Sequence, residues 1–278
     1  MSQKKSVDRL FVAYKPAGMG SNRFLSKIKR RYGVKKAGFS GTLDPFAKGV
    51  LIIAFGRHTR LFQFLKKAPK TYRATLWLGA FSETLDIEKV TDIKEILPFQ
   101  ENRIKNELDS LKGEITYLPP KYSAKKIDGK RAYDLARKGE EVKLKTITSH
   151  IYDTKLINYN HPFVSFDISI SEGGYIRSMG QILSDKLQVQ GSLSALERLN
   201  EGDFAYEDEK ELNPLRFLNL DENFYLADEE DLILGRKLLI ENFKIQKNGK
   251  YFVKLGKIVS ILEIMDDKVS YLLNGVNI

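Results

Sequence analysis

The 278-residue chain contains no cysteine and only three histidines. The lack of cysteine excludes disulfides, thiolate nucleophiles and cysteine metal sites. His58, His150 and His161 do not have metal-ligand spacing, so no structural metal is expected. No apolar run reaches membrane length, and no signal-peptide core follows the polar residues 1–5. We therefore predict a soluble cytoplasmic protein that does not enter the membrane.

Positive charge, in contrast, is abundant. The chain has 46 lysines and arginines against 36 acidic residues, a net charge of +10. This excess favours a polyanionic partner, although it does not bear on the fold. The length allows one large domain, or one domain with a small appendage. Residues 201–231 are strongly acidic and contain Pro214, so we place a boundary there, between a domain of residues 1–213 and one of residues 214–278.

One stretch, GFSGTLDPFAKGVL at residues 38–51, places a lone carboxylate among glycines. Pro45 pushes Asp44 away from the helical conformation. The apolar residues 50–55 that follow predict a buried strand. Asp44 would then lie on a stiff loop just ahead of a core strand. The alternative is that Asp44 caps a single helical turn or lies in a plain turn, and spacing alone does not decide between them.

Two further residues attract attention by their surroundings. Tyr72 lies in an alternating segment, residues 70–79, that predicts a strand; an inward tyrosine there is ordinarily core. Arg177 follows a predicted strand and a glycine pair and begins a predicted helix. A cation in the first helical turn is disfavoured by about 0.3–1 kcal/mol, and such a local violation marks a candidate functional residue. The alternative for Arg177 is a surface ion pair.

Two segments are rich in lysine and arginine. The first is a predicted helix from Ser21 or Asn22 to Gly33, whose basic face carries no acidic residue. That face consists of Arg23, Lys27, Lys29, Arg30 and Arg31. The second segment follows Pro119 and Pro120 and carries Lys121, Lys125, Lys126, Lys130 and Arg131. A solvated helix face is the plain interpretation of the first segment, whereas an uninterrupted basic face leading to the Asp44 loop favours contact with phosphates.

These motifs resemble those of the TruB family, the bacterial tRNA pseudouridine-55 synthases. Residues 38–51 are similar to that family's G-H-x-G-T-L-D-P-x-A-x-G-V-L, with Phe39 at the histidine position. Further similarities are to the family segments K-P-x-G-x-x-S, G-x-A-T-K, K-x-Y-x-A, T-D-T-x-D, P-P-x-Y-S-A-x-K, G-T-Y-I-R and L-R-R. Further departures are Tyr14 where the family usually has aspartate, and Glu197 where it has the first arginine of L-R-R. Glu83 replaces the first acid of T-D-T-x-D, and Gly174 replaces the threonine of G-T-Y-I-R.

The resemblance implies an α+β pseudouridine synthase fold. Its central sheet would be mixed, largely antiparallel and flanked by helices and loops, with a small β-rich PUA-like module at the C-terminus. It also implies an enzyme that isomerises uridine 55 in the tRNA T-loop after flipping the base. The implied catalytic residues are Asp44, Tyr72 and Arg177. With the basic face included, the predicted substrate-binding residues are Phe39, Asp86, Lys15, Ser21, Lys29, Arg30, Tyr122, Lys125, Lys126 and Tyr175.

The chemistry suits these groups. Isomerisation involves no net redox change and no energy input, so neither a cofactor nor a metal is expected. Arg177 would pair with Asp44 and favour its charged form, while Tyr72 would stack on the base. Whether Asp44 attacks the ribose or the base is left open. The expected partner is the T-arm of tRNA, bound by a monomer without a guide RNA or protein partner.

Two alternatives remain to be weighed against this enzyme. One is a tRNA-binding folding factor, or RNA chaperone, whose catalysis is incidental. The other is an aspartyl-phosphate enzyme, which is disfavoured because no second carboxylate and no metal site lie at suitable spacing.

Overall fold

The computed structural model describes residues 8–123, 126–127, 130–131 and 144–278. Lys125 lies outside these residues, and the side chain of Lys126 is not described, so the predictions for both stay predictions. In the described part of the chain, no helix combines the length and the apolarity needed to cross a membrane.

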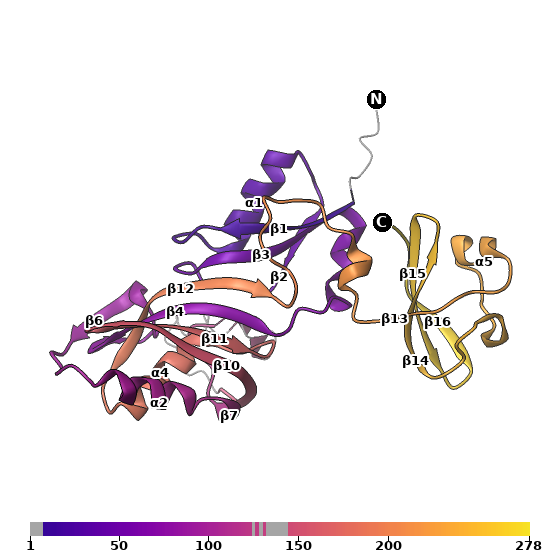
Figure 1. Cartoon of the computed structure of the whole chain (residues 1–278). Helices are drawn as coiled ribbons and strands as arrows, with labels where there is room; N and C mark the ends of the chain where they lie inside the picture. Colours follow the sequence, from indigo (N-terminus) through magenta and orange to yellow (C-terminus); the bar gives the residue numbers. More distant parts are fainter. Residues whose placement is uncertain (1–7, 124–125, 128–129, 132–143) are drawn as a thin grey trace.

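The larger part of the molecule is built on one mixed sheet (Figure 1). Its strands are β1 Arg9–Lys15, β2 Ala37–Ser40, β3 Lys48–Phe55, β4 Lys70–Leu78, β7 Gly113–Tyr117, β10 Ile147–Asn160, β11 Phe163–Ile170 and β12 Gly191–Glu201. The order is β1-β3-β12-β4-β11-β10-β7, with β2 also paired to β3. Every pairing is antiparallel except that of β12 with β3, which confirms the predicted mixed, largely antiparallel sheet.

The shared edge of β3 explains where the Asp44 loop goes. One half of this edge pairs with β2, which ends at Ser40 opposite Ile52. The other half pairs with β12, whose Glu197 and Arg198 lie opposite Lys48 and Gly49. Because β12 occupies the edge that β2 would otherwise continue along, residues 41–47 must leave the sheet. They form an irregular loop with one turn, in which the Ala47 amide donates to the Asp44 carbonyl over 3.1 Å. Asp44 therefore does not begin a helix.

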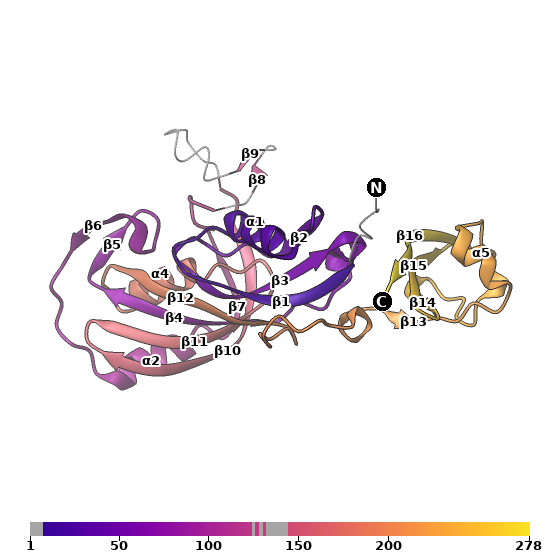
Figure 2. The same cartoon turned by 90° about the horizontal axis from the view of Figure 1, so that it is seen from above.

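Helices cover parts of this sheet. Helix α4, Ile176–Lys186, contacts β4 and β12, and α2, Glu101–Asp109, contacts β10, so both lie on one face (Figures 1 and 2). Helix α1, Ser21–Tyr32, packs against β2 and ends at Gly33, whose left-handed conformation (φ 63°) closes the helix. It begins at Ser21, as predicted, but its N-cap is Gly20, so neither Ser21 nor Asn22 caps the helix as their residue types would allow. The short elements are η1 Gly56–Gln63, β5 Ala80–Ser82, η2 Ile87–Lys89, β6 Val90–Ile93, β8 Lys126–Ile127 and β9 Lys130–Arg131.

A second, smaller sheet forms the C-terminal part of the chain, which confirms the predicted β-rich module. Its order is β13-β14-β15-β16, with β13 Asp221–Glu222, β14 Gly249–Leu255, β15 Ile258–Met265 and β16 Lys268–Asn277. The short helices of this part are η3 Pro214–Phe217, α5 Glu229–Leu234 and η4 Ile240–Asn242. It has its own apolar cluster, including Leu232, Phe243 and Val253. The division after residue 213 stays a prediction.

The smaller sheet rests on the larger part through apolar and polar contacts. Leu273 and Val276 share a buried cluster with Leu10 of β1. The imidazole Nε2 of His58 lies 2.6 Å from the carbonyl oxygen of Asn277. The strand β16 is thereby joined to η1, close to the end of β3.

Candidate active site

Two buried side chains, those of Lys15 and Ser21, hold the Asp44 loop in place. The Lys15 ammonium has no exposed surface and donates to the carbonyls of Pro16, Met19 and Ala47 over 2.9, 2.6 and 2.6 Å. Burial lowers the pKa of Lys15 to about 8, against the opposing pull of the Asp44 charge. The Ser21 hydroxyl donates to the Leu43 carbonyl and accepts from the Leu43 amide, both over 3.0 Å. The structure corrects the prediction that Lys15 and Ser21 face the substrate: their polar groups are spent on the loop.

The same loop is fixed from the side by Arg198 of β12. Its Nε donates to the Val50 carbonyl over 2.8 Å and its Nη2 to the Gly41 carbonyl over 3.2 Å, so one guanidinium ties both flanks of the loop. Gly41 has a φ of +64°, and a Cβ there would lie 2.9 Å from the Lys70 ammonium. Arg198 is itself paired with buried Glu201 over 2.8 Å. Sequence reasoning missed this role, since Arg198 stood out only as part of the L-R-R segment.

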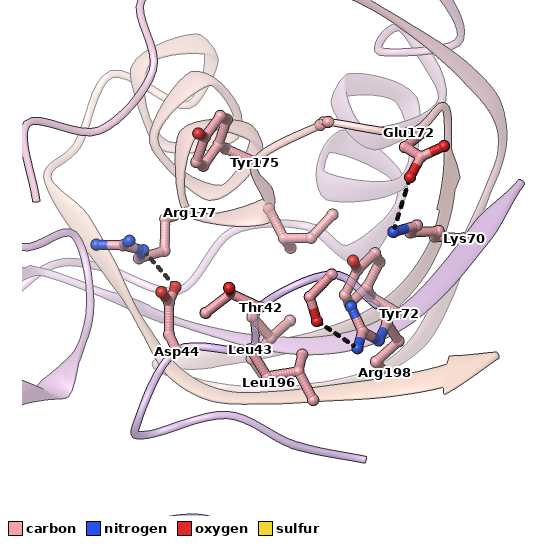
Figure 3. Close-up of a pocket in the computed structure, with 14 residues that line it drawn as sticks. Thr42, Leu43, Asp44, Lys70, Tyr72, Glu172, Tyr175, Arg177, Leu196 and Arg198 are labelled. Atoms are coloured by element: carbon pink, nitrogen blue, oxygen red, sulfur yellow. Dashed lines mark hydrogen bonds and ion pairs between the residues drawn. The ribbon is translucent and has the colours of Figure 1, made fainter. Parts of the chain in front are cut away.

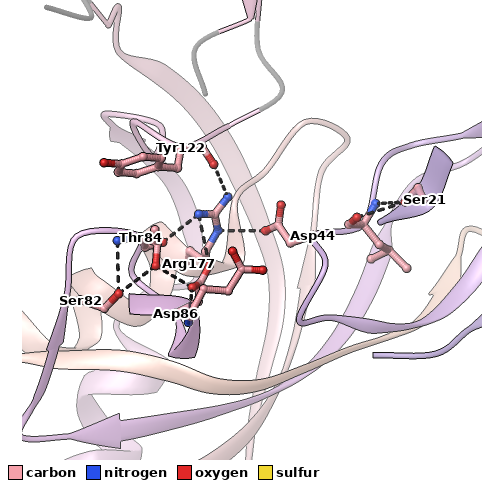
Figure 4. A network of polar contacts seen from close by, with 9 residues as sticks. Ser21, Asp44, Ser82, Thr84, Asp86, Tyr122 and Arg177 are labelled. Carbon is pink, nitrogen blue, oxygen red and sulfur yellow. Dashed lines mark hydrogen bonds and ion pairs between the residues drawn. The ribbon is translucent and has the colours of Figure 1, made fainter. Parts of the chain in front are cut away.

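Arg177 is the centre of a polar network beside the Asp44 loop (Figure 4). Its Nε lies 2.9 Å from the Asp44 carboxylate. Its Nη1 donates to the Thr84 carbonyl and its Nη2 to the Tyr122 carbonyl, both over 2.8 Å. Nη1 also lies 3.5 Å from the Asp86 carboxylate. Because the guanidinium is buried, the alternative of a surface ion pair does not apply.

Asp86 helps to hold the Arg177 guanidinium. Its Oδ1 accepts from the Thr84 hydroxyl over 2.6 Å and from the Glu88 amide over 3.0 Å, which caps η2. Thr84 is held in turn by Ser82 over 2.8 Å. The Asp86 side chain is buried and lies beside the Arg177 guanidinium, which it orients, whereas its predicted contact with the substrate stays a prediction.

Asp44 lies between opposing electrostatic influences. A third of its side-chain surface, 33%, is exposed, and Asp44 is part of the lining of a pocket. Burial raises the pKa of this carboxyl above its ordinary value, and the Asp86 charge adds to the rise. The Arg177 guanidinium and, more weakly, the Lys15 ammonium lower it again. Arg177 thus favours the charged form as expected, but burial outweighs it, and the carboxylate is a stronger base than a free aspartate.

The loop, β4, β12 and the turn before α4 enclose a pocket of about 330 Å³ (Figure 3). This is at the small end of the range for ligand sites, about 300–1,000 Å³. Asp44 and Arg177 lie at one end of it, and Lys70 and Glu172 at the other. Its apolar lining is Leu43, Tyr72, Tyr175, Ile176 and Leu196. Tyr72 is both a buried core residue and part of this lining, so the two interpretations of that residue are compatible.

Comparison with known proteins identifies the family. The sequence model of the TruB family pseudouridylate synthases, N-terminal domain, matches residues 29–176. The tRNA pseudouridine synthase B of Sulfurovum sp. (strain NBC37-1) is 52% identical over 97% of this chain and 98% of its own length. The chain belongs to the TruB family. It is therefore a pseudouridine synthase, an isomerase, as the motifs predicted.

A second relative agrees with this assignment to the TruB family, and two solved structures share the fold. The tRNA pseudouridine synthase B of Sulfurimonas denitrificans is 54% identical over 95% of this chain and 97% of that protein. The crystal structure of a Cbf5–Nop10–Gar1 complex contains a chain with a TM-score of 0.67 and 19% identity, matched over 97% of this chain and 84% of that one. A structure of an archaeal box H/ACA Nop10–Cbf5 complex gives a TM-score of 0.65 at 18% identity, over 97% and 85%. At such identities these structures support the predicted fold alone.

The remaining predicted substrate-binding residues, from the TruB motifs and the basic face of α1, differ in their relation to the pocket. Tyr175 lines it. Tyr122 gives its carbonyl to Arg177, and its hydroxyl lies 3.3 Å from Glu83. Phe39 is half-buried in β2 and packs against the apolar cluster beneath α1. Lys29 is half-buried and Arg30 exposed on α1, outside the pocket lining. For all of these, contact with a substrate stays a prediction.

Two of the departures from the TruB motifs, Tyr14 and Glu197, are in contact. The Tyr14 hydroxyl of β1 donates to the Glu197 carboxylate of β12 over 2.6 Å, and burial together with this hydrogen bond raises the pKa of Tyr14. Lys48 pairs with the same carboxylate over 3.2 Å. A tyrosine–glutamate hydrogen bond thus stands where the family's residues would place an aspartate and an arginine.

Proposed function

We propose that this enzyme converts uridine 55 in the T-loop of tRNA to pseudouridine, with Asp44 as the essential carboxylate. The observation that supports it most is the Asp44–Arg177 pair, 2.9 Å apart, at one end of a pocket partly lined by Tyr72. The relatives' name, tRNA pseudouridine synthase B, supports tRNA as the substrate.

The reaction breaks the bond from ribose C1′ to N1 and forms a bond from C1′ to C5. The proton on C5 is lost and N1 gains one, so atoms and charge balance without a co-reactant. Asp44 acts first at the ribose or at the base and later accepts the C5 proton. Its raised pKa strengthens it as a base, while Arg177 keeps it in position. In the described part of the chain, no cluster of three or more potential metal ligands is present.

The base must leave its stack to reach Asp44, at a cost of a few kcal/mol. Stacking on an aromatic ring returns about 1–3 kcal/mol per base, and we expect Tyr72, which lines the pocket, to provide this ring. Contacts from the basic face of α1 to phosphates supply the rest. The N-terminus of this helix is tied to the Asp44 loop through Ser21 and Leu43, so the surface and the pocket form one unit. We propose that the enzyme works in the cytoplasm as a monomer, without a cofactor, guide RNA or protein partner.

The decisive experiment is Asp44→Asn on purified protein with T-arm RNA. Pseudouridine formation is expected to fall by at least about 10²-fold, because the carboxylate is lost, while RNA binding is retained. Asp167→Asn is the matched control. Asp167 of β11 forms an ion pair with Arg73 of β4, and removing its charge is expected to leave activity unchanged.

Mapping modified positions in total tRNA, with and without the protein, tests the position of the target uridine. Residual activity of the Asp44→Asn protein near the wild-type level would overturn the proposal. A folding factor with incidental catalysis would keep its full biological effect in this variant.

A further inference from the structure

The end of the pocket opposite Asp44 holds a carboxylate between two lysines. The Glu172 carboxylate lies 3.1 Å from the Lys67 ammonium and 3.8 Å from that of Lys70. The two lysine side chains are only 14% and 7% exposed, whereas that of Glu172 is 52% exposed. The cations are therefore fixed by the protein, and the anion between them lies at the surface (Figure 3 shows Glu172 and Lys70).

The fixed charges at this end are unbalanced without Glu172. Lys70 is held by buried Glu201 over 3.0 Å, and Arg198 pairs with the same glutamate over 2.8 Å. Lys70 and Arg198 thus share a single buried carboxylate, and the nearby Lys67 is paired with Glu172. Glu172 supplies a second negative charge, but it comes from the turn before α4 and is not enclosed. The exposed Glu172 carboxylate therefore shows that an oxyanion between the two lysine ammonium groups is stabilised by charge-assisted contacts.

We propose that Lys67 and Lys70 form a subsite for a backbone phosphate of the RNA, which Glu172 occupies in the free enzyme and the phosphate takes over on binding. This rests on the proposed function, in which a nucleotide enters the pocket with its ribose at Asp44. A nucleotide within a strand carries phosphates on both sides of its ribose, so an anion must lie near the pocket. Uracil is neutral and has no charge with which to displace a carboxylate from two ammonium groups, whereas phosphate is a common ligand of lysine.

The proposal predicts opposite effects for the two partners. Glu172→Gln removes the competing anion and is expected to tighten T-arm RNA binding about two- to fivefold, the size of a surface ion pair. Lys67→Met is expected to weaken binding and to lower the magnitude of the slope of log K against log salt by about one, as for one lost phosphate contact. Lys67→Arg keeps the charge and should keep the slope. When Lys67→Met is already present, adding Glu172→Gln should no longer tighten RNA binding.

Asp167→Asn serves again as the matched control, because it raises the net charge by the same one unit at a pair outside the pocket lining. Equal tightening by Asp167→Asn and Glu172→Gln, or an unchanged salt slope in Lys67→Met, would overturn the subsite. Binding is measured in the Asp44→Asn background, so turnover does not interfere. Pseudouridine formation is measured separately in the wild type, so a failure of the subsite is distinguishable from a failure of the proposed function.

Discussion

At the scale of single residues, Asp44 shows how the fold strengthens a catalytic base. A free aspartate has a pKa of about 3.9. In the pocket, burial raises the pKa, and Arg177 opposes the rise without cancelling it. The ionised form of Asp44 therefore destabilises the fold, and the protonated form stabilises it. This stabilisation is fully present below the pKa of Asp44 in the unfolded chain and is lost as pH rises through the higher pKa of the folded state. At pH 7, Asp44→Asn is expected to unfold at the same temperature as the wild type or higher, which separates lost catalysis from lost folding.

The pH dependence of the reaction follows from the same groups. Since the ionised carboxylate acts, kcat/KM is expected to fall as pH drops through the pKa of Asp44, at a pH above the ordinary range for aspartate. Arg177→Met removes the main influence that lowers this pKa, so the acid limb should move to higher pH, whereas Arg177→Lys should move it less. Single-turnover rates across the pH range measure both. An acid limb at the same pH in all three proteins would contradict the assignment of this limb to Asp44.

At the scale of elements, local pattern predicted the parts near the site well. The strand at residues 163–170, the glycine break and the helix carrying Arg177 follow directly from periodicity, and the structure has them as β11 and α4. Sequence did not predict that Lys15 and Ser21 turn inward, because a lysine or serine after a strand is ordinarily exposed. Nor did it predict the insertion of β12, since pairing between distant segments leaves no periodic signal. The role of Arg198 depends on that insertion and was missed with it.

The Tyr14–Glu197 contact between β1 and β12 offers a test of compensation. Tyr14→Asp alone places two carboxylates together, and Glu197→Arg alone leaves the tyrosine without its acceptor and brings a cation to Lys48. Each single change is expected to lower the free energy of unfolding by about 1–3 kcal/mol. The double variant forms an aspartate–arginine pair, so its loss should be at least about 1 kcal/mol smaller than the sum of the two. Urea denaturation of the four proteins measures this, and simple additivity would show that the pair is not coupled.

At the scale of the whole molecule, charge was predicted more easily than geometry. The net charge of +10 and the basic face of α1 already indicated a nucleic acid, whereas the pocket is lined by residues from four segments that are far apart in the sequence. The structure also distinguishes the residues of the basic face of α1 by their ion pairs. Arg31 is engaged by Glu209 of the acidic connector after β12, while in the described part of the chain Lys29 and Arg30 have no ion pair.

This division gives a matched pair of variants for the RNA surface. Lys29→Ala is expected to weaken tRNA binding and to lower the magnitude of the salt slope by about one. Arg31→Ala should change the slope less, because its guanidinium is already paired with a carboxylate of the protein. Titrations at several salt concentrations measure both slopes. Equal slopes for the wild type and Lys29→Ala would remove Lys29 from the phosphate-contacting surface.

The position of β12 also bears on synthesis of the chain. The loop with Asp44 precedes β3, and Tyr72 lies on β4, but these two strands do not pair: β12, made more than a hundred residues later, lies between them. A nascent chain still on the ribosome before residue 191 has therefore two separate half-sheets and no complete catalytic centre. Closing so long a loop is slow compared with local folding. The enzyme should acquire activity only late in translation, when its last core strand has entered the gap.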